Sequence, residues 1–461
     1  MPDPITTSAP SASFPRTRYA YVGTGGRVRM FLDPAAGRYR ETSEVVALCD
    51  SSLVRARYHR DRIARTFGTG PVPVYAADDF RKMIEESRPN VVVVCTVDSE
   101  HARFIVAALE AGCDVVTEKP MTIDATSCAR ILDAVRATGR SVRVAFNYRW
   151  GPGAAKVREV LAGGVIGRIW HVNLEYLLNT SHGADYFRRW HAHKDRSGGL
   201  LVHKSTHHFD LVNWWTDSIP ETVHALGDLR YYGRAAAESR GDAALAAYPR
   251  YHDSGTAGAD PFHYAFEQGM LRDANEEKAL YLEAESESGY VRDRNVFRDD
   301  VTIEDTMSVL VRYRGGMQLA YTLVAYSPYE GFRVSFTGER GRVEYEEFHG
   351  RHVLGHGEVG LEHMHHGRYR LVVHPHFKEP YEVDVAAGDG GHGGADPALQ
   401  DKIFSHDPAP DPLAKSAGHE QGAASILVGI AANRSMETGV PVRIGELVSL
   451  RPEARRLSDL V

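Results

Sequence analysis

The decisive stretch of this 461-residue sequence is Tyr19-Ala20-Tyr21-Val22-Gly23-Thr24-Gly25-Gly26-Arg27-Val28. An apolar run of strand length, residues 19–23, leads directly into a glycine-rich turn, and a helix is expected from Arg27 onward. In such a strand–turn–helix unit the backbone approaches a pyrophosphate, and the helix N-terminus supplies partial positive charge. Val28 stands where the usual spacing has a third glycine, so the motif is imperfect. The assignment as a dinucleotide-binding turn therefore depends on the strand before the turn and the helix after it.

The segments that follow repeat the alternation of strand and helix. Strands are predicted at 45–50, 91–95, 115–117 and 142–146, and helices at 54–67, 101–111 and 125–137. Strands alternating with helices across short loops favour a parallel, doubly wound sheet. We therefore expect a flexible arm over residues 1–17 and a dinucleotide-binding Rossmann domain over residues 18–147.

Asp50 ends the second predicted strand, where a carboxylate can accept hydrogen bonds from an adenosine ribose. The alternative role is that of an N-cap for the next helix, which is a common use of Asp. Ser51 and Ser52 follow without an adjacent Arg, and this favours NAD over NADP.

Composition excludes several classes of protein. The chain has 54 Lys+Arg and 61 Asp+Glu, and the net charge of −7 gives no electrostatic basis for binding nucleic acid or an anionic membrane. Its four Cys residues show no CxxC spacing, which favours a reducing compartment over disulfides or zinc. No run approaches the ~20 apolar residues of a membrane helix, and the first 15 residues do not resemble a signal peptide. A cytoplasmic protein is expected.

The second part of the chain, residues 148–461, has a different character. Helices are predicted at 154–161, 207–215 and 423–436, and extended segments at 168–178, 307–313, 317–324, 333–337 and 342–345. The later segments alternate between glycine turns, as in an antiparallel sheet. Two insertions are expected, near 231–300 with a helical part around 275–281, and near 347–420, which is rich in His, Gly and Pro and should consist mainly of loops.

A chemical motif, Thr117-Glu118-Lys119-Pro120, lies at the end of the predicted strand 115–117. Open α/β sheets bind ligands beside the carboxyl ends of their strands. Together with Cys95-Thr96-Val97-Asp98 and His101, and with Asn147-Tyr148-Arg149, this order of motifs resembles the Gfo/Idh/MocA family of NAD(P)-dependent, mostly sugar- and polyol-directed oxidoreductases. The resemblance implies an N-terminal Rossmann domain and a C-terminal α+β domain with a large, mostly antiparallel sheet. It also implies a homodimer or homotetramer, and these cofactor-binding residues: Gly23, Thr24, Gly25, Gly26, Arg27, Asp50, Thr96, His101, Glu118, Lys119, Asn147 and Arg149.

The resemblance continues into the second domain at Gly198-Gly199-Leu200-Leu201-Val202-His203-Lys204-Ser205-Thr206-His207-His208-Phe209-Asp210. His207 and Asp210 match the family pattern, whereas His203 stands where the family usually has an Asp. Spacing of four residues places His203 and His207 on one helix face. The resemblance implies Lys119 and His207 as the catalytic pair, without deciding which takes the proton, and His203 as a second polar partner that titrates near neutrality.

Other side chains are expected to contact substrate. Aromatic rings that can stack on a sugar and guanidinium donors occur together at 185–191. A solvated loop or a subunit contact is the alternative for this stretch. Residues 391–396 resemble a Gly-His-Gly-Gly stretch of some branches of the family. The candidate substrate contacts are therefore Lys119, Tyr186, Arg189, Trp190, His191, His203, His207, Asp210 and His392. No metal is expected, and the dense histidines between 349 and 376 are interpreted as surface or interface residues.

Three functions remain open at this point. The leading hypothesis is an NAD-dependent dehydrogenase of a sugar, polyol or sugar derivative. The alternative is an NAD-dependent glycoside hydrolase that acts by transient oxidation, elimination and water addition. A catalytically silent NAD-binding protein is the third possibility.

Overall fold

The N-terminal sheet has seven strands in the order β17-β6-β5-β4-β1-β2-β3, and all pairs are parallel except that of the edge strand β17. The computed structural model describes residues 15–255, 260–268, 274–349, 351–354, 357–360, 369–386 and 394–460. The strands are β1 Thr17–Val22, β2 Ser43–Asp50, β3 Val74–Ala76, β4 Val91–Val94, β5 Asp114–Thr117, β6 Val142–Val144 and β17 Ala417–Gly418. The predicted doubly wound parallel sheet is confirmed.

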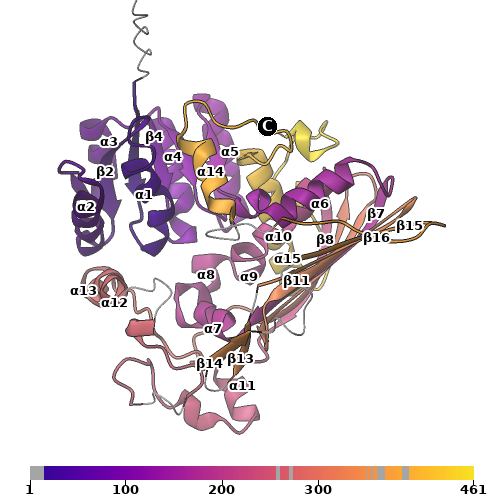
Figure 1. Cartoon of the computed structure of the whole chain (residues 1–461). Helices are drawn as coiled ribbons and strands as arrows, with labels where there is room; N and C mark the ends of the chain where they lie inside the picture. The colour runs from indigo at the N-terminus through magenta and orange to yellow at the C-terminus, as the bar shows by residue number, and fades with distance from the viewer. Residues whose placement is uncertain are drawn as a thin grey trace, which may run out of the picture.

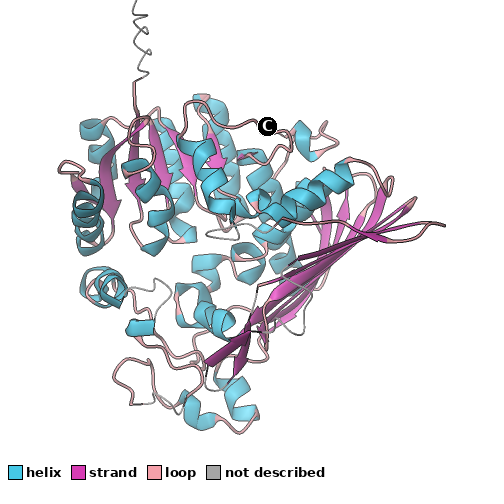
Figure 2. Ribbon diagram, viewed as in Figure 1, coloured by secondary structure: helices cyan, strands magenta, loops and turns pink. Residues whose placement is uncertain are grey.

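Helices cover both faces of this sheet (Figure 2). They are α1 Arg29–Ala36, α2 Leu53–Phe67, α3 Phe80–Ser87, α4 His101–Glu110, α5 Ala125–Thr138 and α14 Ala395–Phe404. Alternate residues of β1 point to opposite faces, so that Ala20 packs with α3, α4 and α5 while Tyr21 packs with α1, α2 and α14. A short 3-10 turn, Gly26–Val28, precedes α1.

The second domain is built on a nine-stranded sheet in the order β16-β15-β12-β11-β7-β10-β9-β8-β18. Only β7 and β10 pair in parallel. The strands are β7 Ile169–Asn179, β8 Pro220–Asp228, β9 Thr306–Tyr313, β10 Gln318–Ser327, β11 Gly331–Gly338, β12 Gly341–Phe348, β15 Tyr369–Pro375, β16 Tyr381–Glu382 and β18 Val442–Arg443. The predicted large, mostly antiparallel sheet is confirmed.

The helices of the second domain lie between this sheet and the N-terminal domain (Figure 1). They are α6 Pro152–Ala162, α7 Thr180–Arg188, α8 Lys194–Ser197, α9 Leu200–His203, α10 Thr206–Thr216, α15 His419–Thr438 and α16 Ile444–Leu447. In β9 buried and exposed residues alternate strictly, so one sheet face forms the core and the other carries exposed side chains such as Leu310.

The prediction of a loop-dominated insertion over 347–420 is wrong. β15 extends the large sheet, and its Leu371 and Val373 are completely buried. α14 packs on the first domain, and β17 joins the first sheet. These elements are short apolar segments between His- and Gly-rich stretches. They were not predicted, because the residues that they pair with lie far away in the sequence.

The insertion over 231–300 contains α11 Arg234–Ser239, α12 Ala274–Glu277, a π-helical turn Lys278–Leu282 and α13 Glu285–Ser288. Its helical part around 275–281 is confirmed. The arm predicted over 1–17 overlaps β1, which begins at Thr17, and residues 1–14 lie outside the described residues. No helix in the described parts of the chain is long and apolar enough to cross a membrane.

Candidate active site

A cavity of about 920 Å³ lies at the carboxyl ends of the parallel strands, facing the helices α7 to α10. At one end it is lined by the glycine-rich turn and Asp50, in the middle by Lys119, and at the other end by aromatic and histidine side chains of the second domain. Most of the residues predicted for cofactor and substrate therefore meet in a single cavity.

The glycine-rich turn is required by the close approach of β1 to the end of β4. Gly23 has a φ of +84°, and a Cβ there would lie 2.5 Å from the carbonyl carbon of Cys95. The backbone N–H of Thr24 donates to Oδ2 of Asp50 at 2.5 Å, and its hydroxyl donates to the same oxygen at 2.9 Å. The turn is thus fixed from both neighbouring strands.

The Asp50 carboxylate accepts several hydrogen bonds from the protein itself, which its predicted role at the ribose did not include. Its Oδ1 accepts hydrogen bonds from the N–H of Ser52 at 2.8 Å and from Arg55 at 3.3 Å. The carboxylate still lines the cavity. Sequence reasoning missed Arg55 because this residue follows Asp50 by five positions, on the first turn of α2.

The loops after β4 and β5 are joined by His101. Its Nδ1 lies 2.7 Å from the carbonyl oxygen of Pro120, and its Nε2 lies 3.2 Å from that of Thr96. Burial lowers the pKa of His101, which keeps the ring neutral. His101 therefore sets the shape of the strand ends.

Glu118 bridges the two motifs of the first domain. Its Oε1 accepts from Nε of Arg27 at 2.5 Å, and its Oε2 accepts from the backbone N–H of Lys119 at 3.1 Å. The Lys119 side chain leads away from this pair and donates from Nζ to the carbonyl oxygen of His203 at 3.0 Å. Burial lowers the pKa of Lys119 to about 8.

His203 is oriented by a carboxylate from the other domain. Its Nδ1 lies 2.5 Å from Oδ2 of Asp98, in the loop after β4. Burial and the charge of Lys119 lower the pKa of His203, and burial raises the pKa of Asp98. Among the described residues Nε2 of His203 has no hydrogen-bond partner, and the ring lines the cavity.

Aromatic side chains surround these groups. His207 stacks on Tyr148 with a centroid separation of 4.1 Å. Trp190 stacks on His191 at 3.6 Å, and the His191 ring lies 4.3 Å from that of His203. Tyr186 and Arg189 also line the cavity. The 185–191 stretch is thus part of the pocket rather than a solvated loop.

Arg149 and Asp210 are not brought to the cavity. Nε and Nη2 of Arg149 donate to the two carboxylate oxygens of Asp210 at 2.7 and 2.6 Å, and the Arg149 side chain is completely buried. This bidentate pair joins the start of the second domain to α10, so we assign it an internal structural role instead of the predicted contacts with cofactor and substrate.

Two further predicted residues lie elsewhere. Asn147 donates to Asp396 at 3.0 Å and is absent from the cavity lining. His392 lies outside the described residues.

The far end of the cavity contains polar groups that the sequence analysis did not single out. Nζ of Lys204 lies 3.2 Å from the Tyr148 hydroxyl. Glu330 accepts from His182 at 3.0 Å and lies 3.6 Å from His349. Lys204 lies within the motif at 198–210 and could have been found there, whereas Glu330 follows β10 and carries no local signal.

In the described part of the chain no group of three or more His, Cys, Asp or Glu side chains is placed to hold a metal ion. His374, for example, pairs with Glu344 at 3.3 Å.

Fold and cavity together define the class of two-domain oxidoreductases with an NAD-binding Rossmann domain. Residues 17–146 match the model of the oxidoreductase family's NAD-binding Rossmann fold, and residues 158–444 match its C-terminal alpha/beta domain. The chain belongs to the Gfo/Idh/MocA family.

Known relatives agree with this membership. The chain is 34% identical over 441 residues to the putative oxidoreductase YteT of Bacillus subtilis, which covers 92% of this chain and 96% of the relative. It is 32% identical over 131 residues to D-glucoside 3-dehydrogenase of Escherichia coli, or 28% of this chain and 35% of that protein. The aldose-aldose oxidoreductase of Caulobacter crescentus shares the fold, with a TM-score of 0.59 and 15% identity over 93% of this chain and all of the other.

Proposed function

We propose that the protein is an NAD-dependent oxidoreductase that transfers a hydride between nicotinamide and a carbinol carbon of a sugar, polyol or sugar derivative. The observation that carries this proposal is the convergence of Lys119, His203 and His207 on one cavity with the glycine-rich turn. Relatives named as glucoside and inositol dehydrogenases support the choice of a carbohydrate-like substrate.

The nucleotide end of the cavity fits a dinucleotide. The glycine turn allows close backbone approach to a pyrophosphate, α1 follows directly after it, and Asp50 lines this end of the cavity, so we assign its carboxylate to the ribose. The carboxylates of Asp50 and of Glu287, which lies against the start of α2, disfavour an additional 2′-phosphate and support NAD over NADP. When bound, the nicotinamide supplies the acceptor or donor of hydride.

The protein's own groups handle the proton. In the direction of oxidation, the Lys119 ammonium donates a hydrogen bond to the reacting oxygen and stabilises its developing negative charge. Nε2 of His203 accepts the hydroxyl proton, since its other nitrogen is held by Asp98. In this assignment His207, stacked on Tyr148, contacts the substrate, and it is the alternative base. Trp190, Tyr186 and His191 provide apolar faces for the sugar ring and exclude water.

The NAD-dependent glycoside hydrolase is retained as the second candidate. It uses the same first oxidation and then returns the hydride, so it needs a nucleotide that stays in place. The part of the insertion that lies against the nucleotide end of the cavity favours this candidate.

A panel assay tests both candidates. Purified protein is denatured and its released nucleotide identified, and free sugars and chromogenic glycosides are then offered to the native protein. Reduction of nicotinamide by a free sugar supports the dehydrogenase, and release of the aglycone without net reduction supports the hydrolase. The proposed function would be contradicted if wild-type protein catalysed neither reaction. It would also be contradicted if Lys119→Ala catalysed the reaction at the same rate as wild-type protein.

The exposed face of the large sheet is the proposed contact in a homodimer or homotetramer. Leu226 and Leu310 are 69% and 59% exposed on neighbouring strands of this face. Light scattering of wild-type protein and of Leu310→Lys tests the assignment, because a sheet-mediated oligomer should dissociate in the variant.

A further inference from the structure

The insertion of the second domain reaches the nucleotide end of the first domain. We define its residues 276–290 as the clamp segment. Figure 1 shows α12 and α13 beside α2, far from the large sheet to which the rest of their domain belongs. Tyr281, Ser288, Gly289 and Tyr290 line the same cavity as Asp50.

One set of contacts joins the clamp segment to the glycine-rich turn. The backbone N–H of Gly26 donates to the hydroxyl of Tyr281 at 3.2 Å. Arg29, at the start of α1, forms an ion pair at 2.5 Å with Glu276, whose side chain is 1% exposed. Tyr281 therefore lies where the N–H groups of the turn would bind a pyrophosphate.

A second set joins the clamp segment to the adenosine side. The carboxylate of Glu287 accepts from the hydroxyl of Ser52 at 2.8 Å and from the N–H of Val54 at 3.0 Å. Arg55 donates from Nε to the carbonyl oxygen of Leu280 at 2.8 Å, and from Nη2 to the hydroxyl of Ser288 at 2.8 Å. Because Arg55 also contacts Asp50, the clamp segment is connected to the predicted ribose site through one side chain.

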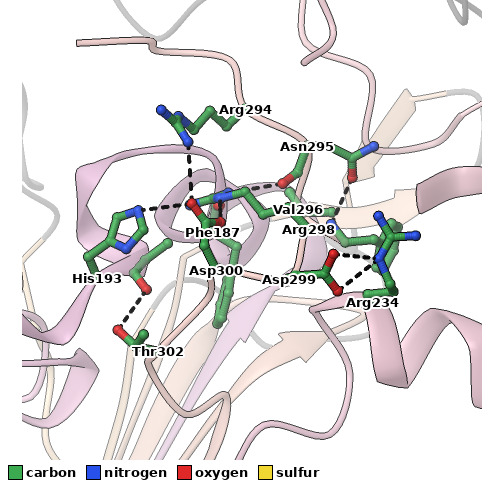
Figure 3. A network of polar contacts seen from close by, with 12 residues as sticks. Phe187, His193, Arg234, Arg294, Asn295, Val296, Arg298, Asp299, Asp300 and Thr302 are labelled. Carbon is green, nitrogen blue, oxygen red and sulfur yellow. Dashed lines mark hydrogen bonds and ion pairs between the residues drawn. The ribbon is translucent and has the colours of Figure 1, made fainter. Parts of the chain in front are cut away.

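The segment is also anchored on the side of the substrate. Arg292, directly beyond the segment, pairs with Asp185 of α7 at 2.7 Å. Figure 3 shows the next anchor, where Arg298 bonds to the carbonyl oxygen of Phe187 and Asp300 lies between Arg294 and His193. The clamp segment is thus held by both domains.

We propose that the clamp segment completes the dinucleotide site and retains the nucleotide through turnover as a resident group. Tyr281 is assigned as a ligand of the pyrophosphate, and Glu287 and Arg55 as the residues that close the adenosine side. Release of the nucleotide then requires the hydrogen bonds of Tyr281, Glu287 and Arg55 to break together. This inference rests on the proposed function and adds a constraint to it.

The constraint concerns where the hydride goes after the sugar is oxidised. Oxidation of a carbinol to a carbonyl removes one hydride and one proton, and a resident nucleotide cannot carry the hydride into solution. The hydride must therefore return to a carbon in the same cavity, either in the oxidised sugar after its rearrangement or in the carbonyl group of a second sugar. The proton accepted in the first half is returned in the second.

Nucleotide retention provides the test, with the full chain and NAD as the probe. Wild-type protein is loaded with NAD and passed through a desalting column, and the remaining nucleotide is measured with time. We expect slow release from wild-type protein and release at least ~10-fold faster from Tyr281→Phe combined with Glu287→Gln, because the Tyr281 hydroxyl is removed and the hydrogen bonds of residue 287 lose their charged acceptor. Glu283→Gln is the matched control, since Glu283 is exposed in the same segment.

Two results would overturn the proposal: release from wild-type protein as fast as from the double variant, or equal release from double variant and control. Thermal melting confirms that the variants are folded. The outcomes also separate this inference from the proposed function. Free exchange of NAD together with Lys119-dependent sugar oxidation contradicts the clamp alone. Retention of NAD that no sugar or glycoside can reduce supports the clamp and contradicts the proposed function.

Discussion

Replacing Asp98 by Asn should slow the chemical step while substrate binding is preserved. Oδ2 of Asp98 lies 2.5 Å from Nδ1 of His203, and the two residues are only 3% and 9% exposed. Hydrogen bonds with a charged partner contribute about 1.5–3 kcal/mol. Each 1.36 kcal/mol corresponds to about tenfold in rate. If this bond is fully expressed in the transition state, kcat should fall about 10-fold to 150-fold.

The value of KM should change little, because Asn has nearly the same shape and the rest of the cavity is untouched. The measurement is a single-turnover reduction of bound nicotinamide by a sugar identified in the panel, for wild-type protein, Asp98→Asn and a control. Asp133→Asn serves as the control, since Asp133 is an exposed residue of α5. A variant with wild-type kcat, or one whose defect lies wholly in KM, would refute the assignment of His203 as the oriented base.

Three further predictions concern protonation, folding and the glycine turn. The lowered pKa of Lys119, about 8, means that its cationic form is lost as the pH rises through 8, so kcat should decline above that pH and Lys119→Arg should shift the decline to higher pH. Arg149→Met leaves Asp210 buried without its partner and should lower the free energy of unfolding by about 3–5 kcal/mol in urea titrations, whereas exposed Arg136→Met should change it little. Gly23→Ala places a Cβ 2.5 Å from backbone atoms and should lower both the melting temperature and the retained nucleotide, and an unchanged variant would contradict the tight turn.

Local patterns were sufficient to predict five strands of the first domain, β1, β2, β4, β5 and β6, and the helices α1, α2, α4 and α5, but not β3, α3, α14 or β17. Most of the predicted strands are apolar runs that neighbouring parallel strands bury, and short loops lead to the helices. The end of β1, Asp50 and Lys119 could be placed on one edge because the carboxyl ends of parallel strands meet there.

The pairings between distant residues could not be predicted in this way. Asp98 and His203 are 105 positions apart, and both are common residue types whose contact depends on how the two domains pack. Arg149 is a second example. Its motif predicted a contact with the cofactor, but its side chain is bound by the buried carboxylate of Asp210, 61 positions later. Periodicity describes elements, and it does not describe which polar side chains face each other across a domain boundary.

The departure from the family pattern at residue 203 agrees with the proposed retention of nucleotide. In this chain the carboxylate is supplied by Asp98, and an imidazole is placed between it and the cavity. Burial lowers the pKa of that imidazole and favours its neutral form, which in the proposed mechanism accepts a proton during oxidation and holds it close to Asp98. A resident nucleotide requires the reverse transfer in the second half of each turnover, and in the proposed mechanism the buried pair of His203 and Asp98 holds the proton until then. The clamp segment and His203 therefore make a joint prediction: oxidation and reduction should occur in the same closed cavity, and deuterium on the oxidised carbon of the sugar should return to a carbon of the product as a hydride without appearing in free nucleotide.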